Sequence, residues 1–140
     1  MSDKVFFDTN VLVYQFDHNS RDKREIAQSL IERSLVSAQP MISTQVVQEF
    51  INVASKKFTD TMTVGELSLF MSELLSRMCR HEPSMEFYER AVSLFKAHWL
   101  QFYDALIIQA AIDLGCTTLY SEDLQDGQKF GGLTIVNPFK

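Results

Sequence analysis

Short apolar runs alternate along the chain with longer segments in which apolar residues recur at helical spacing. The first run, Val5-Phe6-Phe7, has no polar alternation, which is typical of a strand covered on both faces by helices. Later runs at residues 41–43, 117–120 and 133–136 predict further short strands, and Pro40 is expected to break the chain before the first of these.

The segments between these runs predict amphipathic helices, because their apolar residues fall three and four positions apart. The helix over residues 102–114 is apolar nearly all round, which indicates a central, buried position. A methionine-rich and aromatic face between residues 67 and 78 is expected to lie in the core or in a homodimer contact. The other expected buried faces are Ile26, Ala27, Leu30 and Ile31; Val46, Val47, Phe50, Ile51 and Ala54; and Phe87, Ala91, Val92 and Phe95.

Polar residues mark the expected ends of these helices. Thr44 is expected to cap the second helix, and Thr63 followed three residues later by Glu66 forms a capping box for the third. Ser84 opens the next helix, and Gly115 closes the apolar one.

The order of these elements predicts a fold class. Strands alternating with helices are expected of a three-layer α/β/α domain with a mainly parallel central sheet. A chain of 140 residues suits one domain, residues 1–140, and no internal repeat interrupts it.

Composition fits a folded protein outside the membrane. Hydrophobic residues make up 46% and charged residues 22%, which excludes a disordered chain. No apolar run approaches the roughly 18 residues of a membrane span, and no signal segment opens the chain, so a cytoplasmic protein is expected. Cys79 and Cys116 have no paired spacing, which indicates neither a disulfide nor a zinc site.

Four acids from distant parts of the chain are expected at one edge of the sheet. Asp8 and Asp123 follow predicted strands. Asp104 lies in the first turn of the buried helix, and Glu49 lies about one turn inside the helix after the second strand. Strand ends and the helix N-termini that follow them share the ligand-binding edge of such sheets. Singly, each acid is explained as a helix cap or a surface residue, and only their convergence favours a site.

Carboxylates gathered in this way raise one another's pKa unless a cation compensates them. The donors are all hard oxygens, and His18, His81 and His98 have no zinc-like spacing, so Mg²⁺ or Mn²⁺ is expected. Metal-bound water attacks phosphodiesters, which points to a nuclease. The formal net charge of −5 argues against a nucleic-acid partner, but removing four metal-bound carboxylates from the count leaves −1.

Four other acids provide internal comparisons, because none is expected at this edge. All are expected to be solvated: Asp17, Asp113, Glu122 and Asp126. The candidates for phosphate contacts, which also suit a solvated helix face, are Arg21, Lys23, Arg24, Lys56 and Lys57.

Four motifs carry a family resemblance across essentially the whole chain. They are Phe7-Asp8-Thr9-Asn10, Gln48-Glu49-Phe50, Phe102-Tyr103-Asp104-Ala105-Leu106-Ile107 and Leu119-Tyr120-Ser121-Glu122-Asp123-Leu124. In this order and spacing the chain resembles the PIN-domain family, and within it the VapC-like ribonuclease toxins of bacterial toxin–antitoxin pairs.

The resemblance implies an endoribonuclease that cleaves an RNA substrate with Mg²⁺ or Mn²⁺. Asp8, Asp104 and Asp123 would hold the metal directly or through water. Glu49 would hold metal or orient the attacking water. The resemblance also implies that the chain forms a homodimer and that a small cognate antitoxin protein inhibits it.

The resemblance also assigns neighbouring donors. Thr9, Asn10 and Ser121 would fix the rotamers of the carboxylates. The chain departs from the family pattern at Gln101, where many relatives are expected to carry a small hydroxyl residue.

Three alternatives stay open. A phosphatase or phosphotransferase of the haloacid-dehalogenase type also ends its first strand with an aspartate, but it requires a second acid where this chain has Asn10. A PIN-like fold without catalysis would be a binding module. A housekeeping RNA-processing nuclease would share the same four acids, although the short chain favours the toxin.

Overall fold

A single sheet forms the centre of the protein, which a computed structural model describes for residues 3–58 and 62–140. Its strands are β1 (Lys4–Phe7), β2 (Gln39–Ser43), β3 (Cys79–His81), β4 (Thr118–Tyr120), β5 (Lys129–Phe130) and β6 (Leu133–Val136). Across the sheet they lie in the order β3-β2-β1-β4-β6-β5. Neighbouring strands are parallel except β5 and β6, which are antiparallel.

Helices connect the strands and cover both faces of the sheet. They are α1 (Thr9–Tyr14), α2 (Arg21–Ser37), α3 (Thr44–Lys57), α4 (Val64–Phe70), η1 (Met71–Leu75), α5 (Ser76–Met78), α6 (Met85–His98) and α7 (Phe102–Asp113). The segments α4, η1 and α5 follow one another directly, with η1 forming a π-helical turn. None of the described helices combines the length and apolar character needed to cross a bilayer.

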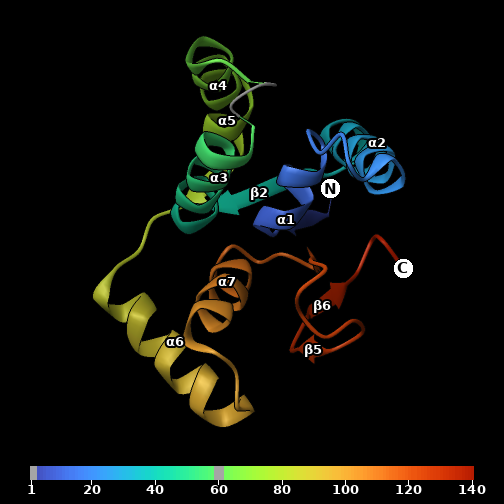
Figure 1. Ribbon diagram of the computed structural model, residues 1–140. Coiled ribbons are helices and arrows are strands. Elements are labelled where there is room, and N and C mark those ends of the chain that lie inside the picture. The colour runs from blue at the N-terminus through green and yellow to red at the C-terminus, as the bar shows by residue number, and fades with distance from the viewer. Residues whose placement is uncertain (1–2, 59–61) are drawn as a thin grey trace.

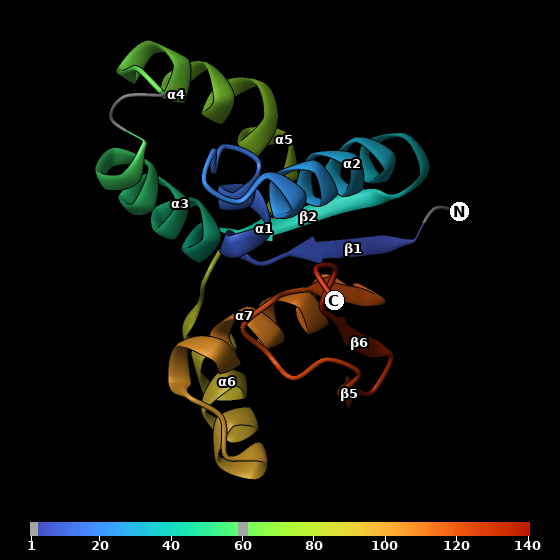
Figure 2. The same ribbon diagram turned by 45° about the vertical axis from the view of Figure 1, so that its right-hand side comes forward.

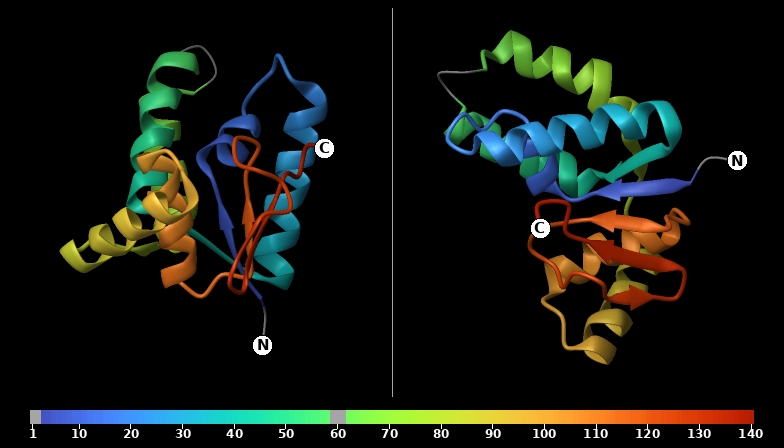
Figure 3. Two further views of the ribbon diagram at one scale, coloured as in Figure 1. Left: turned by 90° about the horizontal axis from the view of Figure 1, so that it is seen from below. Right: turned by 90° about the vertical axis from the view of Figure 1, so that its right-hand side faces the viewer.

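The helices form layers on either side of the sheet. The left view of Figure 3 places α2 on one side of β1 and β6, with α3, α6 and α7 on the other. In Figure 1, α4 and α5 lie above α3, and α6 and α7 lie side by side both there and in Figure 2. The expected three-layer α/β/α class with a mainly parallel sheet is confirmed.

The apolar run at the start of the chain lies at the centre of the core. Phe6 and Phe7 in β1 are completely buried, and a fully buried phenylalanine contributes about 2–3 kcal/mol through the apolar area it removes from water. The helix α7 buries every residue from 105 to 111, so its predicted central position is confirmed.

Two helix starts and one strand test the predictions about local structure. The capping box of Thr63 and Glu66 is present. The prediction for Thr44 was wrong by one position, because the hydroxyl of Ser43 accepts the Val46 N–H at 3.4 Å and caps α3. Pro40 lies inside β2 instead of before it.

The position of Pro40 follows from the alternating directions of N–H groups along a strand. The N–H of Gln39 donates to the carbonyl of Asp3, on the β1 side of β2. The nitrogen of Pro40 therefore faces the other side, where β3 pairs only with Ile42 and Ser43. No ladder bond is lost there.

Other differences concern short elements and helix faces. The strands β3 and β5, which span three and two residues, were not predicted. Ile26 and Val92, expected to be buried, are 37% and 39% exposed. The buried faces of α2 and α6 are therefore narrower than the apolar pattern indicated.

A glycine ends α7 as predicted. Gly115 adopts a φ of +76°, its N–H donates to Ile112, and the N–H of Cys116 donates back to Ala111. This pair of bonds is a Schellman motif, which needs a left-handed residue after the helix.

Replacing Gly115 tests whether this Schellman motif stabilises the end of α7. Gly115→Ala places a Cβ in the left-handed region, so we expect it to lower the free energy of unfolding by about 1–2 kcal/mol. Gly132→Ala is the control, because Gly132 does not have a left-handed φ and its added Cβ meets no atom within 4 Å. Urea unfolding measures both, and equal stabilities would contradict the assignment.

Candidate active site

The carboxylate of Asp8 lies where β1 ends and α1 begins. It is 8% exposed, and it accepts the N–H of Thr9 at 2.8 Å as the N-cap of α1. The hydroxyl of Ser121 donates to its Oδ2 at 2.7 Å from the end of the neighbouring strand β4. Asp8 therefore both caps α1 and lies at the edge of the sheet where β1 and β4 end.

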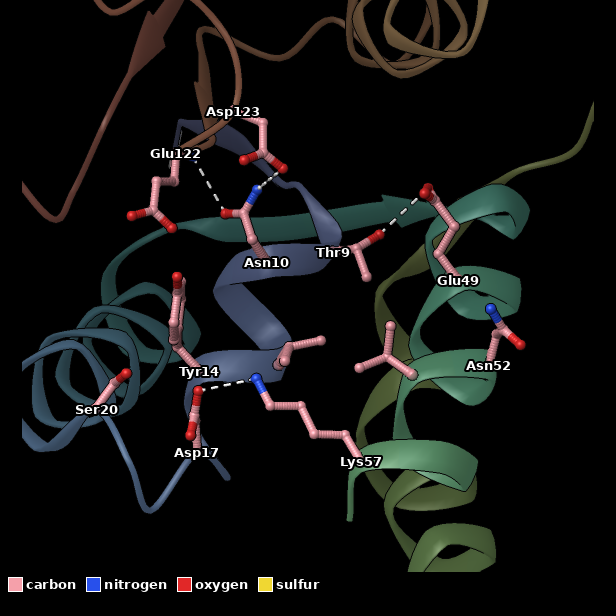
Figure 4. Close-up of a pocket in the computed structure, with 12 residues that line it drawn as sticks. Thr9, Asn10, Tyr14, Asp17, Ser20, Glu49, Asn52, Lys57, Glu122 and Asp123 are labelled. Carbon is pink, nitrogen blue, oxygen red and sulfur yellow. Dashed lines mark hydrogen bonds and ion pairs between the residues drawn. The ribbon is translucent and has the colours of Figure 1, made fainter.

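The amide of Asn10 links Asp8 to the loop after β4. Its Nδ2 donates to Asp123 Oδ2 at 3.2 Å and approaches Asp8 Oδ2 at 3.5 Å. Its Oδ1 accepts the N–H of Glu122 at 3.2 Å, as Figure 4 shows. The N–H of Asp123 also donates to Ser121 Oγ at 3.2 Å. Residues more than one hundred positions apart are thus held together by neutral donors.

The half-buried carboxylate of Glu49 faces α1 from the first half of α3. The hydroxyl of Thr9 donates to its Oε1 at 3.4 Å, and Figure 4 shows the two side chains facing each other. Gln45 Nε2 donates to the same Oε1 at 3.3 Å and also to the carbonyl of Tyr103 at 3.3 Å. Gln45 was not among the predicted site residues, although its position one turn before Glu49 was a usable signal.

Asp104 lies in the first turn of α7, as expected. Its carboxylate accepts no hydrogen bond from any described residue, and the N-cap residue Gln101 makes no side-chain cap bond. The Gln45 contact with Tyr103 brings the start of α7 next to α3. Asp104 is therefore held near Glu49 by backbone position rather than by side-chain partners.

Burial and like charge make Asp8, Glu49 and Asp104 resist ionisation. Burial raises the pKa of Asp8 from 3.8 to about 6, hydrogen bonds from Ser121 and Thr9 oppose the rise, and the charges of Glu49 and Asp123 add to it. Burial also raises the pKa of Glu49, and the negative charges of Asp104 and Asp123 raise it further. The pKa of Asp104 is raised by burial and then by Asp123. The structure thus joins all four predicted acids in one electrostatic cluster.

No lysine, arginine or histidine among the described residues forms an ion pair with any acid of this cluster. The four comparison acids differ in their charge partners. The expectation that they are solvated is confirmed for the exposed Asp113 and Asp126, is wrong for the buried Asp17, and holds in part for the half-buried Glu122. Each has a cationic partner, because lysines and arginines from other elements lie beside them. The pairs are Asp17 with Lys57 at 3.0 Å, Asp113 with Arg90 at 2.6 Å, Asp126 with Lys140 at 3.6 Å, and Glu122 with Lys23.

The cluster has the chemistry of a divalent-cation site. Its donors are hard oxygens without cationic partners among the described residues, and all except the exposed Asp123 are at least partly buried. Hard oxygen donors favour Mg²⁺ or Mn²⁺. Within residues 3–58 and 62–140, no three Asp, Glu, His or Cys side chains lie close enough to enclose an ion as they stand.

Two clefts meet at Asp123. The first, of about 630 Å³, is drawn in Figure 4 and runs past Thr9, Asn10 and Glu49. The second, of about 620 Å³, is lined by Asp104 and Asp123. The buried Asp8 lines neither cleft, but it contacts Thr9 and Asn10, which line the first. A chain longer than one nucleotide would have room to pass across the acids.

The predicted phosphate contacts are mostly engaged elsewhere. Lys57 lines the first cleft but pairs with Asp17, and Lys23 pairs with Glu122. Arg21 pairs with Glu25, and Arg24 contacts His18 at 2.8 Å; Lys56 has no ion-pair partner among the described residues. The site is therefore acidic and poor in free positive charge.

Comparisons with known proteins agree with this architecture. A profile of the PIN domain matches residues 5–125. A chain of a toxin–antitoxin complex from Klebsiella pneumoniae is similar, with 24% identity, a TM-score of 0.71 and coverage of 96% of this chain and 97% of that chain.

Two further solved structures share the fold. VapBC2 from Rickettsia felis, bound to a promoter DNA fragment, matches with 17% identity, a TM-score of 0.64 and coverage of 94% and 96% of the two chains. FitAcB from Neisseria gonorrhoeae matches with 17% identity, a TM-score of 0.62 and coverage of 96% and 98%. No curated protein matches the sequence.

The raised pKa of Asp8 predicts a pH-dependent gain in stability for Asp8→Asn. The folded-state value of about 6 exceeds the ordinary 3.8, so ionising this carboxyl costs the folded state. That cost is absent below about pH 4 and complete above about pH 6. We expect Asp8→Asn to be more stable than the wild type by about 2–3 kcal/mol at pH 7.5 and nearly equal at pH 4.

Urea unfolding in EDTA at these two pH values measures the gain. Asp3→Asn, which changes an exposed aspartate, is the control and should alter stability at neither pH. A gain of the same size at both pH values would contradict the assignment, as would no gain at pH 7.5.

Proposed function

The chain belongs to the PIN domain family, and from that premise we propose that it is an Mg²⁺- or Mn²⁺-dependent endoribonuclease whose four-carboxylate site is Asp8, Glu49, Asp104 and Asp123. The observation that carries the proposal is a contrast in charge balance. The comparison acids all have cationic partners, whereas these four have none among the described residues. A fold that places acids together without compensation gains nothing in stability from them, which supports a cation-binding role.

Asp8, Asp104 and Asp123 are the proposed metal ligands, directly or through water. A bound divalent ion would lower the pKa of its water and neutralise charge that develops on the phosphodiester. Asn10 and Ser121 hold Asp8 and Asp123 in fixed orientations through the hydrogen bonds described above. These neutral donors orient the carboxylates without neutralising them, as a ligand set requires.

Glu49 is the proposed group that orients and deprotonates the attacking water. Both of its donors, Thr9 and Gln45, act on Oε1, so Oε2 accepts no bond from any described residue. Burial raises the pKa of Glu49, which makes this carboxylate a better proton acceptor. In the proposed step the water oxygen bonds to phosphorus, its proton passes to Glu49, and the bond from phosphorus to the leaving oxygen breaks.

The biological setting that we propose is a toxin–antitoxin pair. The similar structures from Klebsiella pneumoniae and Rickettsia felis are a toxin–antitoxin complex and VapBC2. We extend that setting to this chain, with a cognate antitoxin protein as inhibitor and a homodimer as the assembly. The exposed Val64 and Leu69 on α4 support an apolar contact with another chain.

The alternatives separate by experiment. The hypothesis of a haloacid-dehalogenase-type phosphatase was wrong, because the chain belongs to another family. Two residues after Asp8, where that type requires a second acid, this chain has Asn10. An inactive binding module would bind RNA without cleaving it. A housekeeping nuclease would cleave RNA without arresting growth.

Cleavage of a mixed RNA tests the catalytic proposal. We expect the wild type to cleave with Mg²⁺ or Mn²⁺ and not with EDTA. Asp8→Asn and Glu49→Gln should each reduce kcat by at least about 100-fold, because each removes a metal ligand or the base.

Matched controls are Asp3→Asn and Glu32→Gln, which change exposed carboxylates. Glu122→Gln is unsuitable, because Glu122 pairs with Lys23 and lines the first cleft. Cleavage that persists in EDTA, or that is equal in Asp8→Asn and the wild type, would refute the proposal.

Expression in a bacterium tests the toxin setting. We expect the wild-type chain alone to arrest growth within a few generations and Asp104→Asn to leave growth unaffected, because arrest would require RNA cleavage. Immunoblots should show equal amounts of both proteins. Normal growth with an enzyme that is active in vitro would instead favour the housekeeping nuclease.

A further inference from the structure

We propose that Trp99 is a stacking platform for an unpaired base of the RNA substrate, beside the acids at the start of α7. The inference rests on the proposed ribonuclease function and adds to it a substrate-binding residue that no family motif in this chain contains.

Trp99 occupies a position that the fold alone does not explain. It follows the last residue of α6 in a left-handed conformation, with φ 57° and ψ 38°, where glycine is the usual residue. Its side chain is 94% exposed, so the indole gains almost nothing from burial. A bulky aromatic residue in this conformation is uncommon and is found where function requires it.

The backbone around Trp99 is firmly held. Phe95 and Phe102 pack edge to face at 5.9 Å across the link between α6 and α7, and His98 packs against Phe130 at 5.0 Å. The N–H of Leu100 donates to the carbonyl of Phe95. The indole itself makes no ring contact or side-chain hydrogen bond with any described residue. A rigid link thus presents a free aromatic face to solvent.

This aromatic face lies on the second cleft, which is also lined by two of the four acids proposed for catalysis. Trp99 lines that cleft together with Asp104 and Asp123. The remaining polar lining includes the amides of Gln101, Gln125 and Gln128. Stacking on an aromatic ring accepts any base, and amide groups bond to base edges. A nucleotide bound there would place its neighbouring phosphate toward the acids.

The charge distribution favours stacking over phosphate attraction as the source of affinity. The chain carries a net charge of −5, and the cations beside the first cleft, Lys23 and Lys57, are both paired. With few phosphates neutralised, binding should depend weakly on salt. Bases in a duplex are already stacked and cannot reach the indole, so single strands should be preferred.

Fluorescence reports directly on this contact, because Trp99 is the one tryptophan in the sequence. The experiment uses the wild-type chain in EDTA, titrated with a ten-nucleotide unstructured oligoribonucleotide or with the same sequence in a duplex. We expect strong quenching by the single strand and little by the duplex. Binding of the single strand without a change in emission would overturn the inference.

Variants at the same position separate a binding role from a structural one. Trp99→Gly should raise the KM for single-stranded RNA about tenfold, as expected for losing one stacked base, with kcat within about twofold. Its thermal unfolding midpoint should be unchanged or higher, because glycine suits the left-handed backbone. Trp99→Phe should retain most of the affinity.

The outcomes also separate this inference from the nuclease proposal. Quenching without cleavage in Mg²⁺ or Mn²⁺ would retain the platform and refute the nuclease. Cleavage by Trp99→Gly with an unchanged KM would refute the platform, and the exposed indole would then belong to a protein partner.

Discussion

Uncompensated negative charge is the constraint on which the rest of the structure depends. Asp8, Glu49, Asp104 and Asp123 come from positions spread over most of the chain, yet the pKa of each of the first three is raised by the charge of at least one other member. Holding like charges together costs free energy. Elsewhere in the described residues the two acids that are at least partly buried, Asp17 and Glu122, are each paired with a lysine, whereas Asp8, Glu49 and Asp104 are not.

The scaffold meets the constraint with neutral donors and rigid backbone. Parallel pairing of β1 with β4 places Asp8 beside Ser121, and the Asn10 amide then joins both to the loop that carries Asp123. On the other side, Gln45 connects α3 to the start of α7. Hydroxyls and amides fix carboxylate orientation without removing charge, which leaves the acids free to bind a cation.

The sequence was sufficient for features that depend on local pattern and topology. The unbroken apolar run of β1 and the all-round apolar α7 predict a parallel sheet covered by helices on both faces. In such a sheet the strand ends and the helix N-termini that follow them share one edge, which brings distant acids together. Ion pairs such as Lys57 with Asp17 and Lys23 with Glu122 were not predictable, because they join residues 40 and 99 positions apart and depend on helix orientation. The left-handed Trp99 was missed for a similar reason, since local propensity favours glycine there.

The most direct test of this account is calorimetric titration of Mn²⁺ into the metal-free protein at pH 7.5. The account predicts saturable binding in the wild type that weakens by about tenfold or more in Asp8→Asn, Asp104→Asn and Asp123→Asn, because each removes a ligand. Asp113→Asn, at the opposite end of α7, should bind as the wild type does. Equal binding by all of these proteins, or none by the wild type, would contradict the claim that the converging carboxylates form a cation site.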